Sequence, residues 1–173
     1  MFRAGALQVM AQGRRRYTIV HEQYLVEWLM RNYPAGTWRT NVRLGKVTKD
    51  FEKAALTPEE RRALKLWTLQ ADAIVLLEDK VVIVEALVRP EWWKIWQLKE
   101  YEKAFRVTEE FREHWNKPIE LVLLTTQDSP YHLAMARELG IRVVKYRPAW
   151  IEEYLSYYAI RKRRPPGAYM APT

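Results

Sequence analysis

Cysteine is absent from the 173 residues, and only three histidines are present. Without cysteine the chain can form no disulfide framework, zinc–thiolate site, iron–sulfur cluster or cysteine nucleophile. The histidines, His21, His114 and His132, are far apart in the sequence, and none stands at helical or hairpin spacing to another. A histidine-rich metal site is therefore not expected. A metal held by this chain would be bound through oxygen, which favours magnesium, manganese or calcium.

Long apolar runs are missing as well. The longest apolar stretches are interrupted by Asp or Glu within about ten residues, which is well short of the roughly 20 residues that cross a bilayer. At the N-terminus, apolar residues precede the arginines, which is the reverse of a secretory signal. We therefore expect no membrane partner and a location in the cytoplasm or within a virus particle. Few asparagines and abundant Arg, Glu and Pro also point to a thermophilic source.

The composition that is present predicts one folded, basic domain. Of the residues, 49% are hydrophobic and 13% aromatic, which is typical of a chain with a packed core. The formal net charge of +8 favours a polyanionic partner, because counterion release drives binding to nucleic acid; the alternative is a protein that is merely basic. Part of the charge lies in two terminal clusters, which could bind phosphate or act as solubilising tails: Arg14, Arg15, Arg16, Arg161, Lys162, Arg163 and Arg164.

Apolar periodicity and turn residues predict the order of the elements. We expect a helix over 17–32, a strand over 38–44, a short helix over 57–67, a hairpin over 71–88, a helix over 91–105, a strand over 119–125, a helix from 130 to Gly140, a strand over 141–145 and a helix over 149–159. Strands joined by single helices need crossover connections, so the fold class should be α/β, with a mixed central sheet and helices on both faces. A single domain should span residues 17–160, flanked by a basic N-terminal arm of residues 1–16 and a basic, proline-rich tail of residues 161–173.

The hairpin places two acidic residues opposite each other. If its turn is centred between Glu78 and Asp79, Asp72 pairs with Glu85, and directly opposed residues have Cβ atoms about 4.5–5.5 Å apart. Glu85 also lies in the apolar run 81–88, where an unpaired charge is costly. A divalent cation held by both carboxylates would explain this arrangement. The alternatives are a turn one residue longer, which would separate the pair, or an ion pair from Glu85 to an arginine such as Arg39, Arg43 or Arg89.

The helix that follows the hairpin carries Lys94, Gln97 and Tyr101 on one face, because these residues are three and four positions apart. Taken singly, Gln97 would be an ordinary solvated position and Tyr101 a core aromatic. Three tryptophans on this helix could stack on unpaired bases. Helical spacing favours core packing for Trp92 and Trp96 and exposure for Trp93.

Together these features resemble the PD-(D/E)XK nuclease superfamily over roughly residues 17–145. The matching segments are Ala71-Asp72, Glu85-Ala86-Leu87 and Gln97-Leu98-Lys99-Glu100-Tyr101. The resemblance implies a restriction-endonuclease-like αβββαβ core and a hydrolase in which Asp72 and Glu85 bind Mg²⁺, or Mn²⁺, to activate water for phosphodiester hydrolysis. It also implies a metal-binding acidic residue on the first helix, for which Glu27 is the candidate, with Glu22 behind it.

One residue departs from the family pattern. The family lysine should stand two residues after the glutamate and point the same way, but this chain has Leu87. Leucine can neither orient the attacking water nor neutralise the charge that develops on phosphorus. The best-placed substitute is Lys94, which shares a helix face with Gln97 and Tyr101. Arg89 is the second choice, because a guanidinium does not act as a base.

Two hypotheses from different classes follow. In the first, the protein is a metal-dependent DNA nuclease with Asp72, Glu85, Lys94 and Gln97 as catalytic residues. The nucleic acid would be contacted by Arg43, Arg89, Trp93, Tyr101 and the two terminal clusters. In the second, it is a catalytically inactive nuclease-fold protein that binds DNA or serves as an assembly component, for example of a bacteriophage, in a homo-oligomer or a larger protein assembly.

Overall fold

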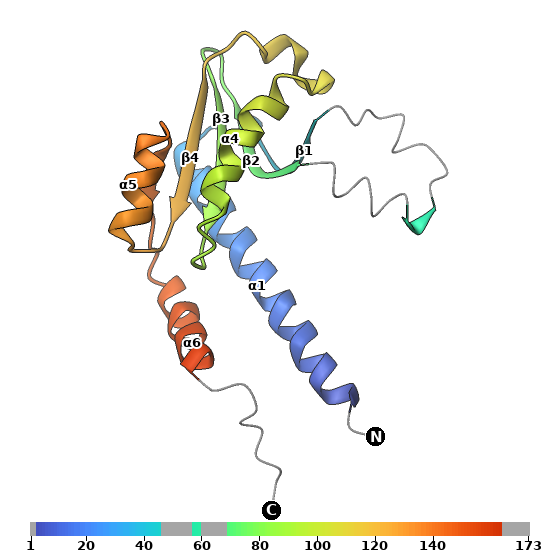
Figure 1. Ribbon diagram of the computed structural model, residues 1–173, viewed down its shortest axis with the longest axis vertical. Helices are drawn as coiled ribbons and strands as arrows, with labels where there is room; N and C mark the ends of the chain where they lie inside the picture. The colour runs from blue at the N-terminus through green and yellow to red at the C-terminus, as the bar shows by residue number, and fades with distance from the viewer. Residues whose placement is uncertain (1–2, 46–56, 60–68, 164–173) are drawn as a thin grey trace, which may run out of the picture. The chain divides into compact units, whose positions relative to one another are not determined.

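The computed structural model describes residues 3–45, 57–59 and 69–163 (Figure 1). Its elements are α1 (Arg3–Asn32), β1 (Trp38–Leu44), β2 (Leu69–Leu76), β3 (Val81–Leu87), α4 (Lys94–Phe105), the 3₁₀ helix η1 (Glu109–His114), β4 (Ile119–Thr125), α5 (Pro130–Glu138), β5 (Arg142–Lys145) and α6 (Ile151–Arg163). The chain divides into two compact units, one of residues 25–146 and one of residues 1–24 with 147–173. In the described part of the chain, no helix has both the length and the apolar character needed to cross a membrane.

The larger unit is built on one mixed sheet of five strands in the order β1-β2-β3-β4-β5. β2 is antiparallel to β1 and β3, whereas β4 is parallel to β3 and β5. The parallel pairs need crossover connections, which α4 and α5 provide. The sheet confirms the α/β class and the mixed strand directions that the sequence predicted.

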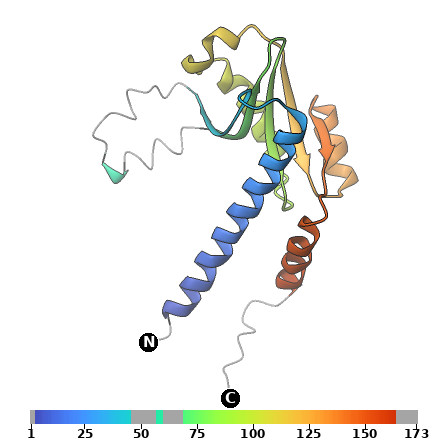
Figure 2. The ribbon, with the colours of Figure 1, turned by 180° about the vertical axis from the view of Figure 1, so that it is seen from behind.

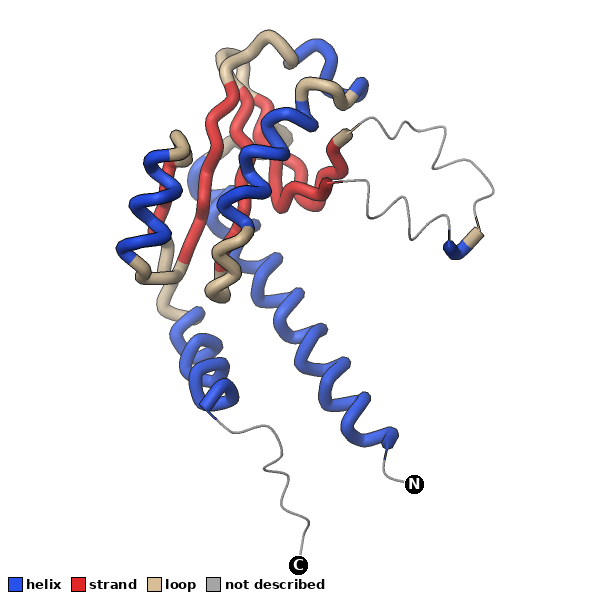
Figure 3. Tube along the Cα trace, viewed as in Figure 1, coloured by secondary structure: helices blue, strands red, loops and turns tan. Residues whose placement is uncertain are grey.

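The helices of this unit cover both faces of the sheet. α4 and α5 lie on one face, and the last turns of α1, residues 25–32, lie on the other (Figure 1, Figure 2 and Figure 3). Ile83 and Leu87 of β3 share one apolar core with Leu98 of α4 and Leu133 of α5. All seven residues of β3 are buried, as expected for a central strand covered on both faces.

The hairpin has the predicted register. Ala73 pairs with Val84 and Leu76 with Val81. The Leu77 amide donates to the Lys80 carbonyl (2.9 Å), so that the loop has two residues and the alternative of a longer turn is wrong. This register brings Asp72 to the position opposite Glu85, although regular pairing of the two strands stops at Ala73 and Val84.

Other boundaries differ from the prediction. α1 begins at Arg3 rather than at residue 17, because the preceding segment, although it lacks an apolar stripe, is rich in residues with high helix propensity. Arg14, Arg15 and Arg16 therefore lie within a helix. α4 begins at Lys94, since a turn closed by the Lys94 amide and the Glu91 carbonyl (3.0 Å) precedes it. The helix η1 was not predicted, and α6 covers 151–163 instead of 149–159.

Some predicted features lie outside the described residues. Of the expected helix over 57–67, the structure describes only residues 57–59. Arg164 and the rest of the proline-rich tail also fall outside it, whereas Arg161, Lys162 and Arg163 end α6.

Candidate functional site

Three elements bring the predicted site residues together. Asp72 comes from β2, Glu85 from β3, and Lys94, Gln97 and Tyr101 from α4, which packs on these two strands. Side chains alternate along a strand, so Glu85 shares the α4 face of β3 with its core neighbours at positions 83 and 87. The site is therefore formed where the sheet meets α4.

Lys94 lies between the two carboxylates. Its Nζ is 2.9 Å from Glu85 Oε1 and 3.7 Å from Asp72 Oδ2. The same ammonium donates to the Ala86 carbonyl (3.3 Å). Glu85 is 2% exposed and Lys94 9%, so this is a buried ion cluster. The cation beside Glu85 is thus a lysine and not one of the arginines considered from the sequence; Arg39 instead binds Glu110.

The backbone is irregular on both sides of Asp72. In the β1–β2 ladder, Thr40 pairs with Ala73 and Val42 with Ala71, but the rung between Asn41 and Asp72 is missing. Asn41 has a φ of 55°, in the left-handed region that side chains rarely adopt within a strand. On the β3 side, Asp72 Oδ2 accepts a hydrogen bond from the Ala86 amide (2.8 Å). The side chain of Asp72 therefore joins β2 to β3 at a point where the regular pairing of the two strands has ended.

Burial and the neighbouring carboxylate raise the pKa of Glu85 from its ordinary value of 4.5 to about 8, against the opposing effect of Lys94. Burial lowers the pKa of Lys94, but Glu85 and Asp72 outweigh it, so the pKa is raised and the ammonium stays charged. The second oxygen of Glu85, Oε2, is buried and has no hydrogen-bond partner. An orphaned oxygen of this kind calls for a proton or a cation.

The Tyr101 side chain links α4 to β2 next to the ion cluster. Its hydroxyl donates to the Gln70 carbonyl on β2 (2.8 Å) and lies 3.2 Å from Gln97 Oε1. Burial, Glu85 and Asp72 together raise the pKa of Tyr101, so its hydroxyl keeps its proton. Because Tyr101 is itself buried, its place is inside the protein and not on a nucleic-acid-binding surface. It fixes Gln97 and the start of β2 relative to α4.

Leu87 is fully buried in the core that α4, α5 and the sheet share. It points to the same face of β3 as Glu85, as expected from the resemblance, but its surroundings are apolar. The position where the family lysine would stand is therefore a packing position in this chain. The only lysine bound to Glu85 in the described part of the chain is Lys94.

The structure does not bring Glu27 to the pair. Its Oε1 accepts hydrogen bonds from Arg31 (2.7 Å) and from the Tyr146 hydroxyl (2.7 Å). Across the ranges that the structure describes, no three His, Cys, Asp or Glu residues lie close enough to hold a metal ion. A metal at this site would therefore have two carboxylate ligands, from Asp72 and Glu85, and take its other ligands from water or substrate.

The remaining nucleic-acid-binding candidates are divided between the two units. Arg43 is exposed on β1, next to the Asn41 irregularity, and Arg89 is half-buried just after β3. Arg14, Arg15 and Arg16 on α1 and the basic end of α6 belong to the smaller unit.

The tryptophans of the α4 region are more exposed than the sequence suggested. Trp93 is 57% exposed, as predicted, but Trp96 is 55% exposed, so the prediction that it packs in the core is wrong. α4 turns Ile95 and Leu98 toward the sheet, which leaves Trp96 on the outer side. Trp92 is half-buried and stacks on His132 of α5, with ring centroids 4.4 Å apart and planes 6° from parallel.

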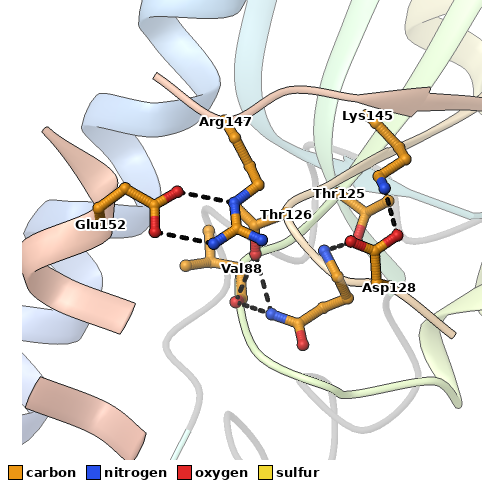
Figure 4. A network of polar contacts seen from close by, with 8 residues as sticks. Val88, Thr125, Thr126, Asp128, Lys145, Arg147 and Glu152 are labelled. Carbon is orange, nitrogen blue, oxygen red and sulfur yellow. Dashed lines mark hydrogen bonds and ion pairs between the residues drawn. The ribbon is translucent and has the colours of Figure 1, made fainter. Parts of the chain in front are cut away.

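A second polar cluster lies where β3 and β4 end (Figure 4). The Val88 carbonyl accepts hydrogen bonds from Thr126 Oγ1 (3.0 Å) and Gln127 Nε2 (2.7 Å). Asp128, which precedes α5, forms an ion pair with Lys145 at the end of β5. These contacts fix the loop that leads into α5 and hence the position of His132 beside Trp92.

Asn41 and the exposure of Trp96 are the features of the site that sequence reasoning missed. The only signal in the sequence for the irregular backbone at position 41 was the residue type, because asparagine tolerates the left-handed conformation and here stands within an otherwise regular alternating strand. Comparison of the chain with protein-family models found no match, and comparisons with curated proteins and with solved structures found none either.

Proposed function

We propose that this chain is a nucleic-acid-binding protein with a restriction-endonuclease-like fold that hydrolyses phosphodiester bonds in DNA with a divalent metal ion. Asp72 and Glu85 would hold Mg²⁺ or Mn²⁺, and Lys94 would take the role of the lysine that Leu87 replaces. The observation that carries the proposal is the convergence of two strand carboxylates with a helix lysine, in which one buried carboxylate oxygen has no partner.

The donor set fits a hard divalent cation. Asp72 and Glu85 offer carboxylate oxygens, which Mg²⁺ and Mn²⁺ prefer, and Glu85 Oε2 has an unused acceptor site. A metal ion bound there lowers the pKa of a coordinated water and offsets charge on the phosphoryl group. Entry of the cation requires Glu85 to give up the proton that burial favours, so binding and deprotonation are coupled.

The protein's own groups supply the rest. Lys94 carries a positive charge at the carboxylates, where it can orient the attacking water and neutralise charge that develops on the phosphate. Gln97 accepts a hydrogen bond from Tyr101 on the same helix, which fixes its amide on the face of α4 that carries Lys94. Asp72 keeps its orientation through the Ala86 amide.

The test is a cleavage assay with Mg²⁺ and Mn²⁺ titrations on supercoiled, linear duplex and single-stranded DNA. Asp72→Asn can still accept a hydrogen bond from the Ala86 amide but loses its charge, and we expect it to abolish cleavage. Lys103→Met, which removes an exposed lysine from the same helix, should cleave like the wild type. Equal cleavage by Asp72→Asn and the wild type would show that the activity does not belong to this site.

A specific observation favours a second candidate function. Lys94 already neutralises the pair at 2.9 Å from Glu85, so the cluster is electrostatically satisfied to a large extent without a metal. A nuclease fold that keeps this ion cluster as a structural element would bind DNA or serve in an assembly without cutting. Binding of DNA without cleavage at any concentration of Mg²⁺ or Mn²⁺ would support this alternative.

A further inference from the structure

Five aromatic side chains, three of them exposed, are grouped at the starts of α4 and α5. We call Trp92, Trp93, Trp96, Tyr131 and His132 the aromatic surface. Three of its members are exposed over more than half of their area: Trp93 (57%), Trp96 (55%) and Tyr131 (74%). Single exposed apolar side chains are ordinary on protein surfaces, but a contiguous exposed apolar patch marks an interaction site.

The ring contacts within the aromatic surface run from α5 to the turn that precedes α4. The Tyr131 ring meets the His132 ring edge to face, with centroids 5.2 Å apart, and His132 stacks on Trp92. Trp92 and Trp93 lie in the turn that precedes α4, and the Trp96 amide donates to the Trp93 carbonyl (3.2 Å), so Trp93 and Trp96 are one turn apart.

The aromatic surface reaches the candidate site on the same helix. Trp93 and Gln97 are four residues apart, so Trp93 lies next to the residue whose amide oxygen accepts a hydrogen bond from Tyr101. Lys94, between Trp93 and Trp96 in the sequence, points inward to Glu85. A polymer lying across the two exposed tryptophans is therefore placed at the edge of the site.

We propose that the aromatic surface binds unpaired bases, so that the strand presented to the site is single-stranded or locally unpaired. This proposal rests on the proposed function for its link to cleavage, but not for binding. Every base has a flat π face that stacks on an indole, whereas in duplex DNA these faces are already occupied by neighbouring base pairs. The net charge of +8 matches a polyanionic strand.

The parallel stack of His132 on Trp92 is an example, within the protein, of a flat heterocycle packed on an indole of this surface. The imidazole covers one indole at 4.4 Å and 6° and occupies that face. The neighbouring indoles of Trp93 and Trp96 are the exposed ones, and a base of similar planarity fits them in the same manner. The occupant to which these observations point is a strand with splayed bases.

The test measures binding in EDTA, where no metal-dependent cleavage occurs. Fluorescence anisotropy compares a labelled 20-nucleotide single strand, the matching duplex, and a strand of equal length and charge in which the central residues are abasic. The variants are Trp93→Ala/Trp96→Ala and Trp93→Phe/Trp96→Phe. The control is Met30→Ala, which removes an exposed apolar side chain elsewhere in the same unit.

We expect the wild type to bind the single strand more tightly than the duplex or the abasic strand. The double alanine variant should lose roughly 5- to 150-fold in affinity for each base that stacks, and this loss should be confined to the strand that carries bases. The double phenylalanine variant should retain much of the preference, and Met30→Ala all of it.

Equal affinity of wild type and double alanine variant for all three ligands overturns the proposal. The proposal is also overturned if sedimentation velocity shows concentration-dependent self-association of every form of the protein except the double alanine variant. The surface would then bind a second copy of the chain. The two proposals fail separately. A preference for unpaired bases without cleavage in Mg²⁺ or Mn²⁺ refutes the nuclease alone, and cleavage without that preference refutes the aromatic surface alone.

Discussion

Replacing Lys94 with methionine removes the ammonium group from between Asp72 and Glu85 and leaves an unbranched side chain of similar length in its place. Both members of the Lys94–Glu85 pair are buried. Removing one partner of a buried pair costs roughly 3–5 kcal/mol when the other charge must remain. Glu85 can avoid this by keeping its proton, because its pKa is already raised to about 8. The loss of stability caused by Lys94→Met should therefore be small in mildly acidic solution and grow as the pH rises.

The sign of the pH dependence follows from the pKa of Glu85. Since the pKa in the folded protein lies above the ordinary value of 4.5, its contribution to stability is fully present below pH 4.5 and is lost as the pH rises through about 8. Within that window each pH unit lowers the free energy of unfolding by at most about 1.4 kcal/mol. Without Lys94, which lowers this pKa, the pKa rises further. The stability of Lys94→Met should then continue to fall above pH 8, where the wild-type contribution of Glu85 is constant.

The assay is urea unfolding followed by circular dichroism at pH 6, 7, 8 and 9. Lys103→Met serves as the control, because its pair with Glu100 is exposed on both sides and such pairs contribute about 0–1 kcal/mol. Mn²⁺ should raise the urea concentration at the unfolding midpoint more for Lys94→Met than for the wild type, since a dication would replace the lost ammonium group. Parallel curves for Lys94→Met and the wild type between pH 7 and 9 would refute the reasoning.

Three further predictions concern the same site. Affinity for Mn²⁺, measured by calorimetry, should increase by up to about tenfold per pH unit toward pH 8, as Glu85 gives up its proton, and Glu85→Gln should flatten this profile. Asn41→Gly should keep the wild-type affinity for Mn²⁺, because glycine adopts a positive φ freely. Asn41→Val should weaken that affinity about tenfold and lower the stability measured by urea unfolding by roughly 1–2 kcal/mol. Equal affinities of the two variants would show that the backbone at Asn41 does not position Asp72. Leu87→Lys combined with Lys94→Met should not restore cleavage and should unfold at lower urea concentration than Lys94→Met alone, because residue 87 lies in the apolar core.

Local rules sufficed for the hairpin and for the placement of Lys94. Two largely apolar strands with one short polar break between them leave little freedom in register, so the pairing of Ala73 with Val84 could be predicted. Residues three and four apart on a helix share a face, which brought Lys94 to the side of α4 that carries Tyr101.

Tertiary packing decided what the sequence could not. The rotation of α4 about its axis is set by how Ile95 and Leu98 fit the sheet, and a one-residue difference in that fit exchanges a buried tryptophan for an exposed one. The early start of α1 depends on helix propensity without an apolar stripe, a pattern that hydrophobic periodicity does not register. The ion pair between Glu85 and Lys94 depends on the distance between two elements, which spacing along the chain does not specify.

The irregular backbone at Asn41 also has a consequence for self-association. β1 is an edge strand of the described sheet, and edge strands present amide and carbonyl groups that can pair with another chain. A residue with a φ of 55° in the middle of this strand breaks the regular spacing of those groups. A β-branched residue at position 41 would make the edge regular and would favour strand addition between molecules. The irregular backbone opposite Asp72 would then also help to keep this edge from pairing with a second sheet.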